Sequence, residues 1–560
     1  MNFHTEEGTV RAPIPLSQKT CDRGAQLDTA HLGDIRGGFG TIRENDVGPR
    51  KNWWARFKTL LAILGPGLIV MVGDNDAGAF GTYTQAGQNY GTTLLWTLLM
   101  LIPVLYVNQE MVLRLGAVTG VGHARLILER FGRFWGAFSV IDLFVLNALT
   151  IVTEFIGLTL AFDYLGIPKL WGVVVAAAII MGAASTGDFR RFERFSLVLV
   201  FGSLLLVPIF LIAHPPMSQL THDFLVPGFP KNGVLADVML LIIAIVGTTV
   251  APWQLFFQQS YVVDKRITPR FMRYERIDLW LGIGLVIIGA VAMMSFSSTA
   301  FEGTTDFGQF KDASAVATGL GLHGGRMAGV LFAIALIDAC IIGASAVSLS
   351  TAYAIGDVLS LRHSLHRKPA DAKGFYAVYF VLIAISAALV LTPGTPLGLL
   401  TNAVQTLAGV LLPGATVFLL LLCNDKAVLG PWANTFKVNL FTGAVIAVLV
   451  MLSVILTASV LFPAITGEQI LWVLGSGCVL ALVATIGILQ WQRRRGVPLV
   501  AAPAVPLAER ATWRMPPLSE LPRPELTMLN LAFLTVLRGY LFIAGGLVLV
   551  RIAQLIAGGH

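Results

Sequence analysis

The sequence predicts an all-α polytopic membrane protein, and three observations support this prediction. The 560-residue chain is 55% hydrophobic and only 13% charged, whereas soluble domains carry about 25% charged residues. Its mean hydropathy is +0.75. Apolar runs of about 18 residues or more, long enough to cross a bilayer as helices, recur along most of the chain. The runs are continuously apolar rather than alternating, which indicates helices and not a transmembrane barrel.

Twelve apolar segments follow one another, joined by short linkers that often contain Gly or Pro. We expect each segment to form a helix of one transmembrane domain over residues 53–495. The segments lie near residues 60–88, 92–115, 136–164, 170–187, 195–213, 235–262, 278–298, 327–358, 375–392, 397–423, 438–463 and 469–491.

The linkers alternate in charge. Basic residues precede the first segment and fill the linker after every even-numbered segment, as in GDFRRFERF at 187–195 and WQRRRG at 491–496. The other linkers are poor in Lys and Arg. By the positive-inside rule, the N-terminus and every basic linker are cytoplasmic. The net charge of +7 therefore reflects topology and not nucleic-acid binding.

The regions outside the twelve segments have other compositions. Residues 1–52 are polar and Gly-rich, which predicts a disordered cytoplasmic tail. Residues 496–526 are Pro/Ala-rich and predict a linker. Residues 527–560 are apolar again but contain Arg538 and Arg551. This last segment is either an extra span or an interfacial helix with snorkelling arginines.

Two segments are interrupted by polar and helix-breaking residues. The first contains GDNDAGA at 73–79, and the sixth contains GTTVAPWQ at 247–254. Unwound backbone in a bilayer is tolerated only where protein or a water-filled cavity satisfies it. The breaks lie five segments apart, and the two groups of five enter the membrane from opposite sides. This pattern predicts an inverted 5+5 repeat with two further helices, and a binding site at the membrane midplane.

Oxygen atoms dominate the potential ligands at the breaks. Asp76 and Asn75 offer side-chain oxygens, and unwinding frees backbone carbonyls. Such ligands suit hard cations such as magnesium, manganese and calcium. Neither break contains histidine or cysteine, and the second contains no methionine. The sequence therefore disfavours a soft-metal site. All nine histidines lie in tails, loops or span ends, so we expect no proton relay through an intramembrane histidine.

Four other polar residues inside apolar segments leave two interpretations open. They are Glu154 in the third segment, Gln254 after the second break, Asp338 in the eighth segment and Gln405 in the tenth. Each either takes part in cation or proton binding, or forms a structural hydrogen bond between helices.

These features resemble the NRAMP family of divalent metal transporters. The similarity covers about residues 60–492. Beyond the two breaks, Gln405 followed by Pro413 matches the family's tenth helix, and FAIALIDACIIGASAVSLSTAYAIGDVL resembles its eighth. The resemblance implies a LeuT-type fold, with metal bound between the unwound parts of the first and sixth helices.

The chain departs from the family's motifs at the ligand positions. The family's Asp-Pro-Gly-Asn is Asp-Ala-Gly-Ala at 76–79, so Ala79 replaces the asparagine ligand. The family's Met-Pro-His is Ala-Pro-Trp at 251–253, which removes the sulfur ligand at Ala251 and the histidine.

Two further departures concern protons. Gln258 stands where the family has a second histidine, and Ile151 stands where it has an acid three residues before Glu154. The stretches at the breaks look like the NRAMP-related magnesium transporter branch. That resemblance implies transport of Mg²⁺, and of Mn²⁺ as well, without proton coupling. Loss of the thioether removes a ligand that favours transition metals. A wider site can also accept an ion that keeps several waters, as magnesium does.

The predicted site residues have three kinds of role. Asp76 is the direct charged ligand, supported by backbone carbonyls near Gly73 and Thr248. Asn75, Gln254 and Gln405 contact the ion or its water shell, whereas Ala79 and Ala251 act by being small. Glu154 and Asp338 are either proton-binding or structural.

The predicted function is alternating-access transport of Mg²⁺ and Mn²⁺ by a monomer in the plasma (inner) membrane of a prokaryote. Its partners are the divalent ion and the lipid bilayer, with no nucleic acid, no resident cofactor and no enzymatic activity. One alternative is a proton-coupled Mn²⁺/Fe²⁺ transporter of the NRAMP type. Another is an amino-acid carrier of the same general fold, which Asp76 disfavours because it repels a carboxylate. From another class, a non-transporting membrane metal sensor would need an effector domain that the sequence does not reveal.

Overall fold

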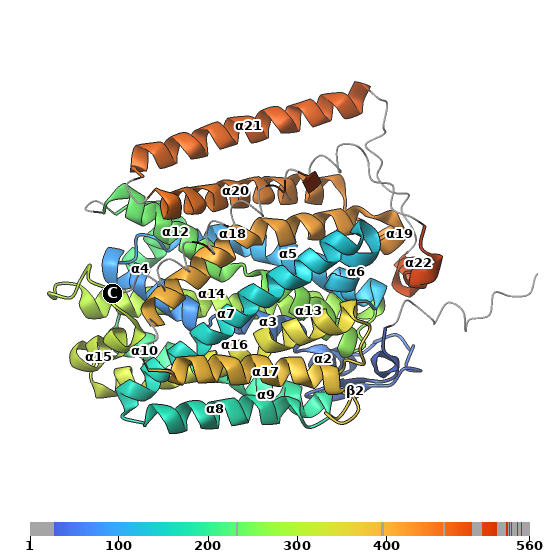
Figure 1. The fold of residues 1–560 in the computed structure, drawn as a ribbon, viewed down its shortest axis with the longest axis horizontal. Coiled ribbons are helices and arrows are strands. Elements are labelled where there is room, and N and C mark those ends of the chain that lie inside the picture. Colours follow the sequence, from blue (N-terminus) through green and yellow to red (C-terminus); the bar gives the residue numbers. More distant parts are fainter. Residues whose placement is uncertain are drawn as a thin grey trace, which may run out of the picture.

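The fold is a bundle of long helices that run roughly side by side (Figure 1). The computed structural model describes residues 27–230, 233–393, 397–462, 465–494 and 507–522, together with single positions beyond residue 533. Within this part of the chain, the one sheet is a small antiparallel hairpin of β1 (Ile35–Gly37) and β2 (Gly40–Ile42), with Ile35 opposite Ile42.

The first five predicted segments are helical, and two of them are divided into shorter helices. They form α2 (Trp53–Ile63), α3 (Pro66–Val72), α4 (Ala77–Tyr90), α5 (Trp96–Thr119), α7 (Arg133–Leu165), α8 (Lys169–Ala184), α9 (Phe189–Gly202), η2 (Ser203–Leu205) and α10 (Leu206–Ala213). Shorter connecting elements are η1 (Thr29–His31), α6 (His123–Phe131) and α11 (Met217–Leu225).

The remaining seven predicted segments are helical as well. They form α12 (Leu235–Thr249), α13 (Pro252–Asp264), α14 (Met272–Phe301), α16 (Arg326–Val358), α17 (Lys373–Leu391), α18 (Leu397–Asn424), α20 (Phe436–Leu461) and α21 (Gly467–Arg494). Between and after them lie η3 (Pro269–Phe271), α15 (Ala313–His323), α19 (Lys426–Leu429), η4 (Gly430–Trp432), α22 (Leu507–Thr512) and η5 (Leu518–Glu520).

The helices meet the physical requirement for crossing a bilayer. Eight of those described are long and apolar enough, or ten when each of two bent pairs counts as one span. One bent pair is α2 with α3, which meet at 49°. α8 has 16 residues and is shorter than a full span. The protein is therefore an integral membrane protein of the predicted all-α class.

The helix contacts follow the predicted inverted repeat. In such a repeat, each of segments one to five corresponds to the segment five places later. A contact between the first and seventh segments should therefore have a counterpart between the sixth and second segments. Both contacts exist, since α3 and α4 pack on α14, and α13 packs on α5. The third and eighth segments, α7 and α16, pack along each other at the centre. This symmetry places the two broken segments next to each other.

The prediction of a disordered tail over residues 1–52 is wrong for the part that the structure describes. Residues 27–50, here called the amino-terminal strap, contain η1 and the hairpin. The strap lies beside α2, at the end of the bundle opposite α15 (Figure 1). Arg266 donates to the carbonyls of Ala30 (2.8 and 3.0 Å) and Asp34 (2.9 Å). The polar composition of the strap suggested disorder. Hydrogen bonds from basic residues at the helix ends, such as Arg266 after α13, hold the strap in place. Residues 1–26 lie outside the described part.

The predicted linker over 496–526 is also partly folded. Residues 507–522 dock on the ends of α5 and α6, where Met515 N–H donates to the Val118 carbonyl (3.2 Å). Arg130 donates to the carbonyl of Pro522 (2.6 Å). Most of residues 527–560 lie outside the described part of the chain, so the prediction of an extra span or an interfacial helix there stays open.

Candidate metal site

The first break lies between α3 and α4. α3 ends at Val72, and the amides of Asp74 and Asn75 bond to carbonyls three residues back, closing tight turns. α4 then begins at its N-cap Asp76, whose Oδ1 accepts from Ala79 N–H at 2.9 Å. Aspartate is among the preferred N-cap residues. The polar triplet is therefore the local signal that stops one helix and starts the next.

The first break frees a backbone carbonyl. In a continuous helix the Gly73 carbonyl would accept from Ala77 N–H. Here that N–H donates instead to Glu154 Oε2 at 3.2 Å, from α7. The expected carbonyl near Gly73 is thus without its ordinary helical partner.

The second break frees a carbonyl for a different reason. α12 ends at Thr249, and α13 starts with Pro252 at its first position. Proline is well suited to the first turn because its fixed φ is helical and it needs no acceptor. Its missing N–H leaves the Thr248 carbonyl without the partner that a continuous helix would supply.

The two breaks are held together by direct contacts. Tyr83 on α4 and Thr249 on α12 share a hydrogen bond of 2.6 Å between their hydroxyl oxygens. α13 packs on α3, and α12 packs on α4. Gly73 faces Trp253, the second residue of α13. Four half-helix ends therefore meet in one buried region, as the paired breaks predict.

Several polar atoms in this region are buried without ordinary hydrogen bonds. Asp74 lies next to Gln254, yet neither of its carboxylate oxygens has a hydrogen bond of normal geometry. Asn75 donates its Nδ2 to the Val286 carbonyl (3.3 Å), while its Oδ1 has no partner among the described residues. Buried polar atoms are normally paired, so free oxygens here fit a cation or its water shell.

Asp74 is the residue that the sequence prediction missed. It is 1% exposed, compared with 7% for Asp76. The sequence prediction chose Asp76 from the polar triplet at 74–76 as the charged ligand and gave Asp74 no role. Only the backbone turn decides that one of them is the helix cap and that the other is left with two free oxygens.

Of the two glutamines that were predicted to contact the ion or its water shell, the structure describes the side chain of one. Gln254 Oε1 accepts from Gln109 Nε2 at 2.9 Å, which ties α13 to α5 and occupies the oxygen that would face a cation. Its Nε2 is buried without a partner and is able to donate to water. Gln405 belongs to α18, which packs on α12, but its side chain lies outside the described part.

The two acids left open by the sequence behave differently. Glu154 lies at the first break, with Oε2 on the Ala77 amide and its carboxyl beside that of Asp76. Asp338 faces Gly202 on the fifth segment, because a Cβ on Gly202 would lie 2.3 Å from Asp338 Oδ1. Glu154 is therefore brought to the site, whereas Asp338 is not.

The two alanines that were predicted to act by being small lie at the two breaks. Ala79 is fully buried in the first turn of α4, and Ala251 is the partly buried N-cap of α13. Among the described residues, no group of three or more His, Cys, Asp or Glu side chains could hold a metal. A cation at the breaks would need backbone carbonyls, amide oxygens or water as further ligands.

Buried charged side chains gather where α2 meets α3. Asp278 on α14 accepts from the amides of Gly65 (3.0 Å) and Gly67 (2.6 Å), at the start of α3. Lys265 donates to the carbonyls at the end of α2 and pairs with Glu193 at 2.7 Å, with both side chains fully buried. These charges fix the bend between α2 and α3.

Comparison with known proteins agrees with this geometry. The family model described as "Natural resistance-associated macrophage protein-like" (Nramp) matches residues 67–459. The divalent metal cation transporter MntH of Ralstonia nicotianae is 30% identical over 396 residues, covering 68% of this chain and 86% of the relative. The MntH of Xylella fastidiosa is 28% identical over 421 residues, covering 72% and 84%.

A solved structure has the same fold. The manganese transporter of Eremococcus coleocola superposes with a TM-score of 0.61 at 21% identity, covering 84% of this chain and 99% of that one. At this identity the likeness concerns the fold alone, and it agrees with the predicted LeuT-type 5+5 arrangement. Since the family model spans most of the transmembrane domain, including both helix breaks, the chain belongs to the Nramp family.

Proposed function

We propose that the protein carries divalent metal cations across the membrane by alternating access. The observation that carries this proposal is the meeting of two helix breaks around Asp76, with the Gly73 and Thr248 carbonyls freed beside it. The relatives named as divalent metal cation transporters support the same activity. A divalent ion entering a cell gains about 4–5 kcal/mol per 100 mV of membrane potential, which is enough to drive uptake.

For the ion itself, we propose Mg²⁺, with Mn²⁺ also accepted. The side chains at the breaks supply carboxylate and amide oxygens, and Ala251 supplies no sulfur. Oxygen ligands suit magnesium, and the small Ala79 and Ala251 side chains suit an ion that keeps part of its water shell. Transport would then need no proton partner, and a monomer in the plasma membrane would suffice.

A second candidate is proton-coupled manganese transport. The names of the relatives favour it over magnesium, because they are divalent metal and manganese transporters. Glu154 also favours it, since its carboxyl lies beside that of Asp76 in a fully buried place. Two adjacent buried carboxylates repel each other, so either a cation lies between them or one of them binds a proton.

One flux experiment separates the two candidates. Purified protein in liposomes would be supplied with Mg²⁺, Mn²⁺ or Ca²⁺ at two pH values, with a pH-sensitive dye inside. Magnesium uptake with a constant internal pH supports the first proposal. Manganese uptake with internal acidification, and no magnesium uptake, supports the second. Failure to move any of the three ions would contradict transport as proposed.

A further inference from the structure

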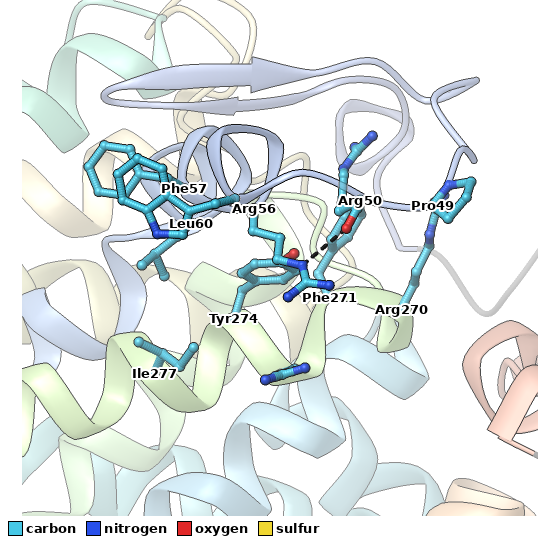
Figure 2. Close-up of a pocket in the computed structure, with 11 residues that line it drawn as sticks. Pro49, Arg50, Arg56, Phe57, Leu60, Arg270, Phe271, Tyr274 and Ile277 are labelled. Atoms are coloured by element: carbon cyan, nitrogen blue, oxygen red, sulfur yellow. Dashed lines mark hydrogen bonds between the residues drawn. The ribbon is translucent and has the colours of Figure 1, made fainter.

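A basic cavity lies away from the metal site, at the cytoplasmic ends of α2 and α14 (Figure 2). It has a volume of about 410 Å³ and is lined by the end of the amino-terminal strap, α2, η3 and the first turns of α14. Four arginines line it, namely Arg50, Arg56, Arg270 and Arg273. We call it the arginine pocket.

The charge of the arginine pocket is largely uncompensated. Arg50 pairs with Asp46 through two bonds of 2.7 and 2.8 Å. Arg270 instead donates to the backbone carbonyls of Asp46 (2.9 Å) and Gly48 (2.7 Å), and Arg56 Nε donates to the carbonyl of Arg50 (3.1 Å). Carbonyls orient a guanidinium without neutralising it.

Among the described residues, the structure gives no ion pair to the other three arginines, Arg56, Arg270 and Arg273. Nε of Arg50 is moreover buried without a hydrogen-bond partner. The pocket therefore presents about three net positive charges and free N–H donors toward one hollow.

Aromatic side chains place the arginine pocket at the membrane surface. Trp53 lines it and is 64% exposed, its neighbour Trp54 is 63% exposed, and Phe57 is 38% exposed. The Trp53 and Phe57 rings stack at 5.6 Å. Exposed tryptophans of membrane proteins concentrate at the headgroup level. Leu60 and Ile277, one helix turn deeper, continue the pocket wall with apolar surface (Figure 2).

We propose that the arginine pocket binds the phosphate headgroup of an anionic phospholipid of the cytoplasmic leaflet. Guanidinium groups recognise phosphate oxygens bidentately, and basic pockets between transmembrane helices on the cytoplasmic side bind anionic headgroups. The apolar wall formed by Phe57, Leu60 and Ile277 accommodates the acyl chains. A soluble phosphate would use the arginines but would gain nothing from this wall.

The position of the arginine pocket gives the lipid a mechanical role. Its walls come from α2 on one side and α14 on the other, and the bend between α2 and α3 is held by Asp278 of α14. A headgroup bound to Arg56 and Arg273 would bridge α2 and α14. It would thereby stabilise the arrangement of α2 against α14.

Native mass spectrometry of the purified full-length protein tests the proposal. The probes are phosphatidylglycerol, phosphatidylcholine and inorganic phosphate at equal concentrations. We expect one tight phosphatidylglycerol site in the wild type. The Arg56→Gln/Arg273→Gln variant should bind about thirtyfold more weakly, because each arginine near anionic lipid contributes about 1 kcal/mol. Arg191→Gln/Arg362→Gln is the matched control, since it removes two exposed cytoplasmic arginines that do not line the pocket.

Three results would overturn the proposal. They are equal phosphatidylglycerol binding by the Arg56→Gln/Arg273→Gln variant, equal binding of phosphatidylcholine by the wild type, and occupancy by inorganic phosphate as strong as that by the lipid. The wild-type comparisons need no variant, so they decide the question even if the double variant does not fold. Arg56→Lys/Arg273→Lys should bind with a strength between those of the wild type and the glutamine variant, because it keeps the charge but loses the bidentate guanidinium contacts.

Discussion

Asp76 has a structural role beside its proposed role as an ion ligand. Oδ1 accepts the Ala79 amide and starts α4, while the carboxyl also lies beside Glu154 at the site. Asparagine caps a helix about as well as aspartate does, but it carries no charge. One substitution therefore separates the structural role of this residue from its proposed role in ion binding.

We expect Asp76→Asn to fold as stably as the wild type but to lose divalent-ion uptake by about ten- to hundredfold. Interactions with a charged group contribute about 1.5–3 kcal/mol, which corresponds to that loss. Uptake in proteoliposomes and thermal unfolding in detergent measure the two effects. Asp338→Asn is the control, because Asp338 faces Gly202 and not the breaks. Undiminished uptake by Asp76→Asn would remove Asp76 from the ligand set.

The second residue-scale prediction concerns the missing sulfur. Ala251→Met should shift the ratio of manganese to magnesium uptake toward manganese by about tenfold, or ~1.4 kcal/mol, because a thioether favours transition metals. Competition between the two ions in the flux assay measures this ratio. Ala251→Leu has similar bulk without sulfur. An equal shift in both variants would assign the effect to size.

The position of a single residue could be predicted from the sequence where it depends on one helix break. The place of Asp76 at a helix break could be predicted because this residue precedes a glycine-containing helix start in an apolar segment. The contact of Glu154 with Ala77 could not, since 77 positions separate them. The pairing of Gln254 with Gln109 spans 145 positions. Such contacts depend on how helices pack, and one sequence alone does not specify that packing.

At the scale of elements, the bend between α2 and α3 has its own construction. Gly65 has φ of +153°, a backbone conformation that L side chains rarely adopt. Lys265 neutralises the carbonyl end of α2, and Asp278 binds the amide end of α3. This arrangement matches each charge to the helix end with the opposite partial charge.

Gly65→Ala should destabilise the protein by about 1–3 kcal/mol, the usual cost of such backbone strain. A Cβ at this position would also lie 2.4 Å from Glu193 Oε1. The thermal unfolding midpoint in detergent should fall. Gly284→Ala on α14 is the matched control, because its Cβ would meet open space. Equal midpoints for both variants would argue against a strained bend.

The twelve helical segments were predictable because long apolar runs in a bilayer must satisfy their own backbone. Both breaks near the site were predictable from Gly, Pro and acidic residues. The bend at Gly65 was missed, although LGPGL at 64–68 carries its signal. α11, α15 and the hairpin were also missed, since short polar elements form only where the bundle offers them partners.

At the scale of the whole molecule, the amino-terminal strap joins elements that are distant in sequence. Asp28 accepts from Arg367 at 2.5 Å and from the amide of His363 at 3.0 Å. His31 Nε2 lies 3.1 Å from the His363 carbonyl and 3.7 Å from Asp264. The strap thereby connects the end of α13 to the loop between α16 and α17.

This junction predicts a loss of stability at alkaline pH. Burial lowers the pKa of His363, but the hydrogen bond and charge of Asp357, 2.9 Å away, outweigh burial and raise the pKa from 6.5 to about 9. Protonated His363 therefore stabilises the fold fully below pH 6.5, and this contribution of about 3 kcal/mol is lost as pH rises through about 9.

Thermal unfolding between pH 6 and pH 10 measures this contribution. His363→Gln should lower the midpoint near pH 6 and should show less of the alkaline loss than the wild type. His222→Gln, at an exposed position on α11, is the control. The same alkaline loss in His363→Gln as in the wild type would contradict the role of His363.

The strap also constrains the order in which the molecule is completed during synthesis. The strap precedes α2 in the sequence, yet the partners of Asp28 lie 335 and 339 positions later. The contacts of the strap with α2 and Arg266 can form earlier, but Asp28 must remain without its partners until the residues after α16 have been made. The completion of this junction is therefore a late event of biogenesis, and a nascent chain that stops before residue 363 would lack both the partners of Asp28 and the helices from α17 onward.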